Sequence, residues 1–264
     1  MFDWWRRLSR AEVIAHEFPE AFHALILKRV PCATLLDDAE LGKLEALVRI
    51  FNSEKSFEGA GGLEVSEEMR VIVAARACLL LLHRIELDEP LYADLETVVV
   101  YPSTYRARVT ERQGYVMVEG EQQRLGESWQ RGTVVLSWDA VQSGAANPGD
   151  GHDVVLHEFA HQLDAEDGAM DGTPELGALD RYAVWGKIAG AEYAALLDDV
   201  EHHRKTSIDA YGATNAPEFF AVVVEQFFEK PSALARRHPE LYEQLAAFFR
   251  FDPVQRLTDR RRSI

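Results

Sequence analysis

Cysteine is scarce in this chain, and basic residues are outnumbered by acidic ones. The 264 residues include two cysteines, Cys32 and Cys78, and neither belongs to a CxxC pair. This excludes a cysteine-based zinc or redox site and suits a reducing compartment such as the cytoplasm. Lysine and arginine total 28 against 44 acidic residues, so the formal net charge is −16. Because such a charge repels phosphates, we expect no direct binding of nucleic acid.

Long apolar runs and a secretory leader are lacking too. The longest apolar run, 71–82, is interrupted by Arg76 and is too short to span a bilayer. The first ten residues have no apolar core of the kind that a signal peptide carries. Hydrophobic residues make up 47% of the chain, which is enough for a substantial core. We therefore expect a cytoplasmic protein without a membrane span.

The most informative feature that is present is the segment 156–161, which carries the pattern HExxH inside an apolar run. His157 and His161 are four residues apart, so on a helix their imidazoles face the same way and can bind one metal ion. Glu158 is then placed to take a proton from a water whose pKa zinc lowers to about 7. The alternative is a pair of hydrogen-bonded core histidines.

A catalytic zinc needs a third protein ligand, and three carboxylates downstream are candidates. Asp164 and Asp167 follow His161 in an acidic loop, where ordinary helix-end and turn chemistry is the alternative. Glu218 comes three residues after Asn215, at the start of a second predicted helix with an apolar body. For Glu218 the alternative is a capping box with Asn215. The residues alone leave this choice open.

Two segments carry a resemblance to known proteins. HEFAHQLD and YGATNAPEFFAVVVEQFF together resemble the Mlc titration factor A family of zinc peptidases, and the second also resembles the catalytic domain of anthrax lethal factor. In both, a tyrosine and a glutamate seven residues apart follow the HExxH helix. The resemblance implies one zinc ion per chain, bound by His157, His161 and Glu218. It also implies that Tyr211 is catalytic beside Glu158 and points at the substrate-side oxygen, where a packing role is the alternative.

The predicted elements run from helices through a small sheet to further helices, which is the α+β class. Strands are expected at 96–101, 115–118 and 133–138. Helices are expected at 11–30 with a break at Pro19, at 38–51, from 66 to about 87, around the HExxH pattern, after Asn215, and at 239–249. Loops are expected at 52–62 and 143–151, and the basic end 256–262 is expected to be a solvated tail.

The whole chain is expected to form one domain. The resemblance implies a zincin-like core over 1–264, with 1–90 mainly helical and 91–264 holding the sheet and both metal-site helices. The strand at 133–138 is our candidate for an edge that holds an extended peptide, with an interior strand as the alternative. Glu225, two helical turns after Glu218, either orients a ligating imidazole or is a solvated charge.

Three functions stay open. The first is a zinc metallopeptidase that uses Glu218, with the aminopeptidase preference and peptide substrates that the resemblance implies. The second is a zinc peptidase with Asp167 as third ligand, which is weakened because Asp164 stands where the HExxHxxGxxD pattern has glycine. The third is a zinc-containing regulatory protein that sequesters a partner with little proteolysis. For such a partner the resemblance implies an Mlc-type transcriptional repressor of sugar uptake.

Overall fold

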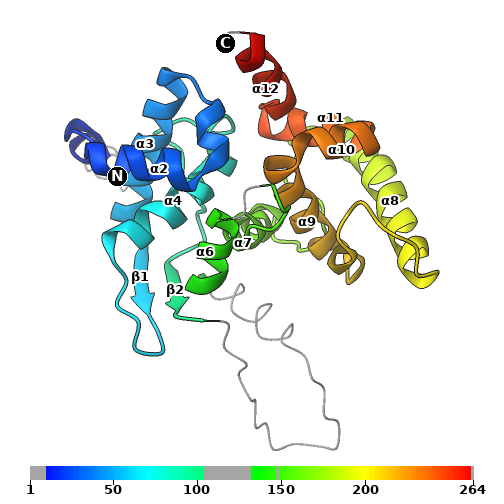
Figure 1. Cartoon of the computed structure of the whole chain (residues 1–264), viewed down its shortest axis with the longest axis horizontal. Helices are drawn as coiled ribbons and strands as arrows, with labels where there is room; N and C mark the ends of the chain where they lie inside the picture. The colour runs from blue at the N-terminus through cyan, green and yellow to red at the C-terminus, as the bar shows by residue number, and fades with distance from the viewer. Residues whose placement is uncertain (1–9, 104–131, 147–148, 263–264) are drawn as a thin grey trace, which may run out of the picture.

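The computed structural model describes residues 10–103, 132–146 and 149–262, which form a largely helical protein with one small sheet (Figure 1). The labelled helices are α2 (Glu20–Arg29), α3 (Asp38–Glu54), α4 (Glu67–Leu81), α6 (Trp138–Ala146), α7 (Val154–Asp164), α8 (Leu179–Glu201), α9 (Ala216–Glu229), α10 (Pro231–Arg237), α11 (Pro239–Phe249) and α12 (Pro253–Arg262). The 3-10 helices are η1 (Pro31–Leu35) and η2 (Ala210–Ala213), and the strands are β1 (Ser56–Gly59), β2 (Thr97–Tyr101) and β3 (Thr133–Ser137). The predicted α+β class is confirmed.

The three strands pair in parallel in the order β1–β2–β3. Val98 of β2 lies opposite Phe57 on one side and Val134 on the other. Alternate residues of β2 and β3 are fully buried, as the period of two in a strand requires. Among the described residues no strand pairs with the outer side of β3, so β3 lies at an edge of this sheet and packs against α7.

Helix α4 forms the centre of the N-terminal part. All of its residues from 71 to 81 are buried, because α2, α3 and α7 pack around it. A helix that is apolar on every side is stable only when it is enclosed in this way. Arg76 is the exception to that apolar surface, and its side chain is 1% exposed. In Figure 1, α7 lies between the N-terminal helices and the group α8–α11.

Several predicted boundaries were wrong. Helix α4 ends at Leu81 rather than near residue 87, and β1 lies inside the expected loop 52–62. Helix α6 occupies the first part of the expected loop 143–151, and α8 was not expected at all. The strand expected at 115–118 lies outside the described residues. No helix among the described residues is long and apolar enough to cross a membrane.

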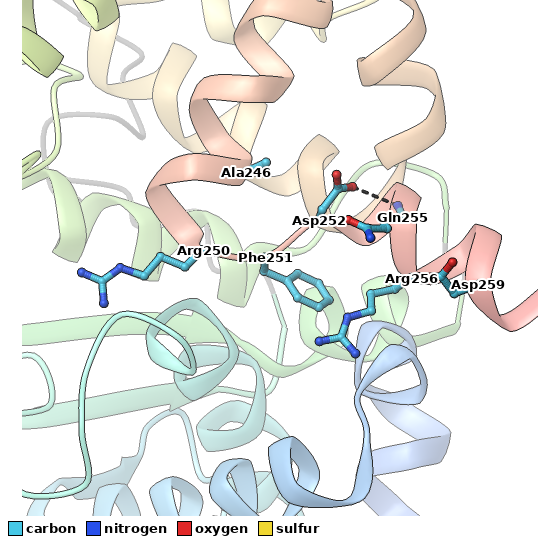
Figure 2. A pocket seen from close by; sticks show the side chains of 7 residues that line it. All are labelled: Ala246, Arg250, Phe251, Asp252, Gln255, Arg256 and Asp259. Carbon is cyan, nitrogen blue, oxygen red and sulfur yellow. Dashed lines mark hydrogen bonds between the residues drawn. The ribbon is translucent and has the colours of Figure 1, made fainter.

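The basic end of the chain is helix α12 rather than a solvated tail. Arg256 forms an ion pair with Glu40 of α3, and Arg260 donates to the backbone carbonyl of Thr34 in η1. A cavity of about 430 Å³ lies where α11 meets α12 (Figure 2). Beside it, the ring of Phe251 stacks on His83 with centroids 5.3 Å apart. These contacts attach the C-terminal helices to the N-terminal ones.

Candidate metal centre

Helix α7 presents the HExxH residues because its first turn is capped and its apolar face is buried. The Asp153 side chain accepts hydrogen bonds from the backbone N–H groups of Val155 at 3.0 Å and Leu156 at 3.2 Å. An aspartate at this position satisfies N–H groups that have no partner within the helix. Helix α7 packs closely against α9, which carries Glu218. The two histidines therefore face the first turn of α9.

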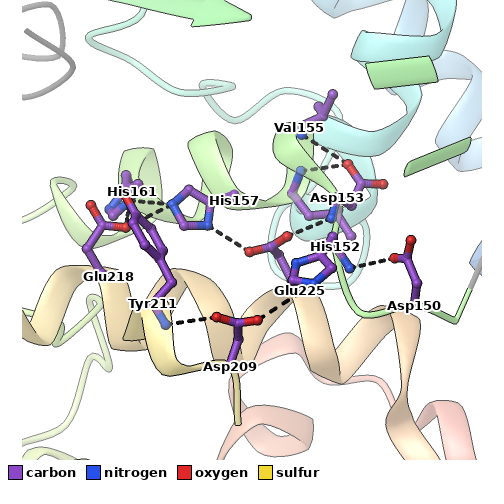
Figure 3. Close-up of polar contacts among 11 residues, drawn as sticks. Asp150, His152, Asp153, Val155, His157, His161, Asp209, Tyr211, Glu218 and Glu225 are labelled. Carbon is purple, nitrogen blue, oxygen red and sulfur yellow. Dashed lines mark hydrogen bonds and ion pairs between the residues drawn. The ribbon is translucent and has the colours of Figure 1, made fainter. Parts of the chain in front are cut away.

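The structure brings three predicted ligands together (Figure 3). The Oε2 atom of Glu218 lies 3.0 Å from Nε2 of His157 and 3.5 Å from Nε2 of His161. The two Nε2 atoms are 3.2 Å apart. Within the described ranges, this is the one group of three or more His, Cys, Asp or Glu side chains whose ligand atoms lie close enough together to hold a metal ion.

The spacing of these atoms fits a tetrahedral zinc ion. Zinc–nitrogen and zinc–oxygen bonds of about 2.0–2.1 Å place neighbouring ligand atoms of a tetrahedron about 3.3 Å apart. The observed separations of 3.0, 3.2 and 3.5 Å lie around that value. Two imidazoles and one carboxylate leave the fourth corner for water, which is the ligand set of catalytic rather than structural zinc. The residues present therefore fit the metal.

Glu218 reaches the histidines because of the way α9 begins. Asn215 is the N-cap, and its Oδ1 accepts a hydrogen bond of 2.9 Å from the backbone N–H of Glu218. Proline in the first turn, at position 217, has a fixed backbone angle that suits a helix start. The predicted cap is confirmed. The carboxylate of Glu218 turns toward His157 and His161, as Figure 3 shows.

The three candidate ligands strongly perturb one another's pKa values. Burial alone would lower the pKa of His157, but its hydrogen bonds to Glu218 and Glu225 outweigh burial and raise the pKa to about 10. Burial and the neighbouring His157 charge lower the pKa of His161 to about 4. Burial opposes ionisation of Glu218, yet the bonds from both histidines lower its pKa to about 2. The ionised carboxylate of Glu218 thus faces the protonated imidazole of His157. A metal ion bound between them can replace that proton.

Glu225 fixes the orientation of His157. Its Oε1 accepts a hydrogen bond of 2.7 Å from Nδ1 of His157, which leaves Nε2 for a metal. Its Oε2 accepts a bond of 2.6 Å from the backbone N–H of Asp153. The Glu225 residue is 6% exposed, so the alternative of a solvated charge is wrong. An imidazole held by a carboxylate is also a stronger ligand.

A buried ion pair behind this contact was not foreseen. The guanidinium of Arg76 lies 3.1 Å from the carboxylate of Asp153, and both side chains are almost fully buried. Arg76 also donates to the backbone carbonyls of Arg29 and Val141. The sequence did contain an indication of this ion pair, namely an arginine inside an apolar helix, because a buried charge needs a partner of opposite charge. This pair links α4 to the start of α7.

The two predicted catalytic residues come from different elements, Glu158 from α7 and Tyr211 from η2. Glu158 is on α7, is 4% exposed, and adds to the negative field that raises the pKa of His157. Tyr211 is in η2 with its ring centroid 5.9 Å from that of His157, and it is 41% exposed. The backbone N–H of Tyr211 donates to Asp209, which helps to fix the turn. Tyr211 thus faces solvent beside the candidate metal ligands rather than the core.

The other two candidate ligands lie elsewhere. Asp167 is exposed, and its Oδ1 accepts a hydrogen bond of 2.9 Å from the backbone N–H of Ala169, which is turn chemistry. Asp164 is fully buried at the end of α7, where Oδ2 accepts from the backbone N–H of Gly172 at 3.0 Å. Gly172 has a φ of +82° and lies so close to the backbone of Ala216 that a side chain would clash there. Asp164 therefore holds a loop against the start of α9.

Asparagine in place of Asp164 is expected to stabilise the fold at pH 8 by about 2 kcal/mol. Burial raises the pKa of Asp164 to about 6, against the hydrogen bond from Gly172. The folded chain then binds this proton more tightly than the unfolded chain, so stability falls as pH rises from about 4 to 6. Asp164→Asn keeps an accepting oxygen and removes the charge. Urea unfolding at pH 8 and pH 4.5 measures the difference.

The gain should largely vanish at pH 4.5, where the carboxyl of Asp164 is mostly protonated in the folded protein. Asp167→Asn is the matched control at an exposed position, and it should change stability by less than about 0.5 kcal/mol at either pH. An equal gain from Asp164→Asn at both pH values would contradict an ionisation cost.

Comparison with known proteins identifies the family. The model of the glucose-regulated metallo-peptidase M90 family matches residues 2–250. The chain belongs to this family. M90 membership makes it a metallopeptidase-like protein and implies a metal cofactor, which the cluster of His157, His161 and Glu218 could bind. The resemblance found in the sequence motifs is confirmed.

Relatives of this M90 chain match it over most of their length. An uncharacterised protein of Synechocystis is 39% identical over 252 residues, covering 95% of this chain and 90% of the relative. Mlc titration factor A of Serratia proteamaculans is 30% identical over 232 residues, with 86% of each chain covered. Mlc titration factor A of an Escherichia coli strain is 29% identical over 262 residues, with 97% and 94% covered.

Proposed function

We propose that this chain is a zinc-dependent metallopeptidase of aminopeptidase type that acts on peptides in the cytoplasm. The observation that carries the proposal is the cluster of His157, His161 and Glu218, whose ligand atoms lie at the spacing of a tetrahedral zinc. Membership of the M90 family supports a metallopeptidase. Zinc, the site residues and the aminopeptidase preference are the parts that we add.

Each residue around the cluster has a role in this proposal. When bound, zinc would lower the pKa of a water molecule and polarise the peptide carbonyl. Glu158 accepts the proton of that water and returns it to the leaving amine. Glu225 holds His157 in the tautomer whose Nε2 is free to bind metal. The hydroxyl of Tyr211 donates a hydrogen bond to the carbonyl oxygen as negative charge develops there.

Space for a substrate adjoins the cluster. A cavity of about 310 Å³ is lined by His157 and Tyr211 and by small residues of α6, among them Ala140 and Gly144. The outer side of β3 could add one extended strand of substrate backbone by hydrogen bonding. A cavity for a side chain and an edge for a backbone are what a peptidase requires.

A second candidate function is the binding of a regulatory protein. Two relatives carry the name Mlc titration factor A, which suggests binding to the Mlc repressor. We propose that an Mlc-type repressor is a partner of this chain as well. In the alternative to a peptidase, the metal would support only the binding of this partner, and the chain would hydrolyse peptides slowly. Measured hydrolysis that depends on Glu158 separates the peptidase from that case.

Hydrolysis of a peptide panel, with and without a chelator, tests the proposed function. The purified chain should cleave peptides with a free N-terminus, lose this activity in chelator, and regain it when zinc is restored. Matched peptides with an acetylated N-terminus should be cleaved poorly, because an aminopeptidase recognises the free amine. Cleavage that survives the chelator would contradict a metallopeptidase, and equal cleavage of blocked peptides would contradict the aminopeptidase type.

Tyr211→Phe is expected to lower kcat more than it raises KM. The hydroxyl contacts an oxygen whose charge grows only in the transition state, so its removal acts mainly on kcat. One oxyanion donor is worth about 2.7–4 kcal/mol, which is an upper guide because zinc shares the charge. Steady-state kinetics with the free peptide measures both constants. Since phenylalanine keeps the ring beside His157, zinc content should not change; parent kinetics would mean that Tyr211 is a packing residue.

A further inference from the structure

A second cluster of reactive side chains lies outside the metal centre. The Oγ atom of Ser207 lies 2.6 Å from Nε2 of His238, and Nδ1 of the same ring lies 2.7 Å from Oε2 of Glu192. Glu192 belongs to α8, Ser207 lies in the segment before η2, and His238 is the N-cap of α11. A hydroxyl, an imidazole and a carboxylate in this order form the arrangement that activates serine nucleophiles.

The backbone around this cluster is held in place. The carbonyl of Ser207 accepts a hydrogen bond of 3.2 Å from the side chain of Gln226, and the next residue, Ile208, is buried. The backbone N–H of His238 donates to Leu234 at 2.8 Å. A nucleophile gains from such fixation, because little freedom remains to be lost when it reacts.

Exposure and hydrogen bonding both suit a base-activated serine. Ser207 is exposed, whereas the side chains of His238 and Glu192 are 16% and 25% exposed. A reagent can therefore reach the hydroxyl while its partners stay largely shielded. Because the carboxylate of Glu192 accepts a hydrogen bond from the N–H group at Nδ1, Nε2 is left as the acceptor for the hydroxyl of Ser207. This is the tautomer that can take a proton from serine.

We propose that Ser207 is an activated nucleophile that is acylated by activated esters and phosphonylated by fluorophosphonates, independently of any metal. With an activated ester, the Oγ atom bonds to the acyl carbon, the bond to the leaving phenolate breaks, and the proton of Oγ passes through Nε2 of His238 to that phenolate. With a fluorophosphonate, Oγ bonds to phosphorus, the P–F bond breaks, fluoride leaves, and the proton of Oγ passes to Nε2 of His238 and then to water. Water then hydrolyses the acyl-serine with His238 again as base, and the carboxylic acid is released. The substrate class follows from the parts present, since a good leaving group departs without a built oxyanion site.

Labelling of the full-length chain with a fluorophosphonate probe, in the presence of a chelator, tests the proposal. Peptide mapping by mass spectrometry reads the labelled residue in the parent protein, so the result does not depend on how a variant folds. Ser232 in α10 is an exposed serine and serves as the internal comparison. We expect Ser207 to react about 100-fold faster than Ser232, the range of general-base assistance. Equal rates at the two serines would overturn the proposal.

Variants then assign the base. His238→Gln keeps a polar side chain and removes the base, so labelling of Ser207 should fall by about 100-fold. Glu192→Gln cannot hold the reactive tautomer as a carboxylate does, so a fall of about tenfold or more is expected. Ser207→Ala should abolish the burst of phenolate from p-nitrophenyl acetate, whereas Ser232→Ala should leave it unchanged. Labelling of Ser207 at the parent rate in His238→Gln would show that the imidazole does not activate it.

Discussion

Glutamine in place of Glu158 is expected to lower kcat for peptide hydrolysis by about 10²–10⁴-fold while the chain keeps its zinc. Glu158 lies on α7 but outside the three-residue ligand cluster, so its charge is not needed to hold the metal. Glutamine has the same shape and cannot accept the proton of the attacking water. Kinetics with the free peptide and elemental analysis of the same preparation measure the two quantities together.

Glu166→Gln is the matched control for this variant. Glu166 lies just beyond α7, forms an ion pair with Arg84, and is not one of the three clustered residues. The Glu166→Gln variant should keep the kcat and the zinc content of the parent protein. An unchanged kcat in Glu158→Gln would show that the hydrolysis arises at another site. Loss of zinc in that variant would mean that Glu158 supports the metal rather than the proton transfer.

Removal of a ligand is expected to have the largest effect on the metal. His161→Ala, His157→Ala or Glu218→Ala should each weaken zinc binding by about 100-fold or more, because two protein ligands cannot maintain the tetrahedral site. Glu218→Gln is informative as well, since the amide keeps the shape but brings no negative charge to the ion. Competition with a chromogenic chelator measures the affinity of each purified variant.

Asp167→Ala is the control that separates the two ligand patterns. Asp167 is exposed and bonded to the backbone of Ala169, so its loss should leave zinc affinity at the parent value. If Asp167→Ala loses zinc while Glu218→Ala keeps it, the HExxHxxGxxD pattern is correct and the contact of Glu218 with the histidines does not represent the metal site.

Features that depend on residues close together in the chain were predictable from the sequence. The spacing of His157 and His161 needs only the geometry of one helical turn, and the start of α9 follows from Asn215 and its neighbouring proline. The apolar periods of α3 and α11 likewise depend on residues close together in the chain. Strand β1 was missed because it lacks such a local pattern. Its four residues, SFEG, have no strong strand pattern, and pairing with β2 from a distant part of the chain makes them a strand.

Contacts between distant segments were decided by the tertiary structure. The sequence by itself determined that His157, Glu158 and His161 lie on one helix and that an acidic ligand had to follow, with Asp164, Asp167 and Glu218 left open. Packing of α7 against α9 brought Glu218 to the histidines and buried Glu225 behind His157. No local pattern contains this information, because it arises when the apolar faces of two helices far apart in sequence are buried against each other.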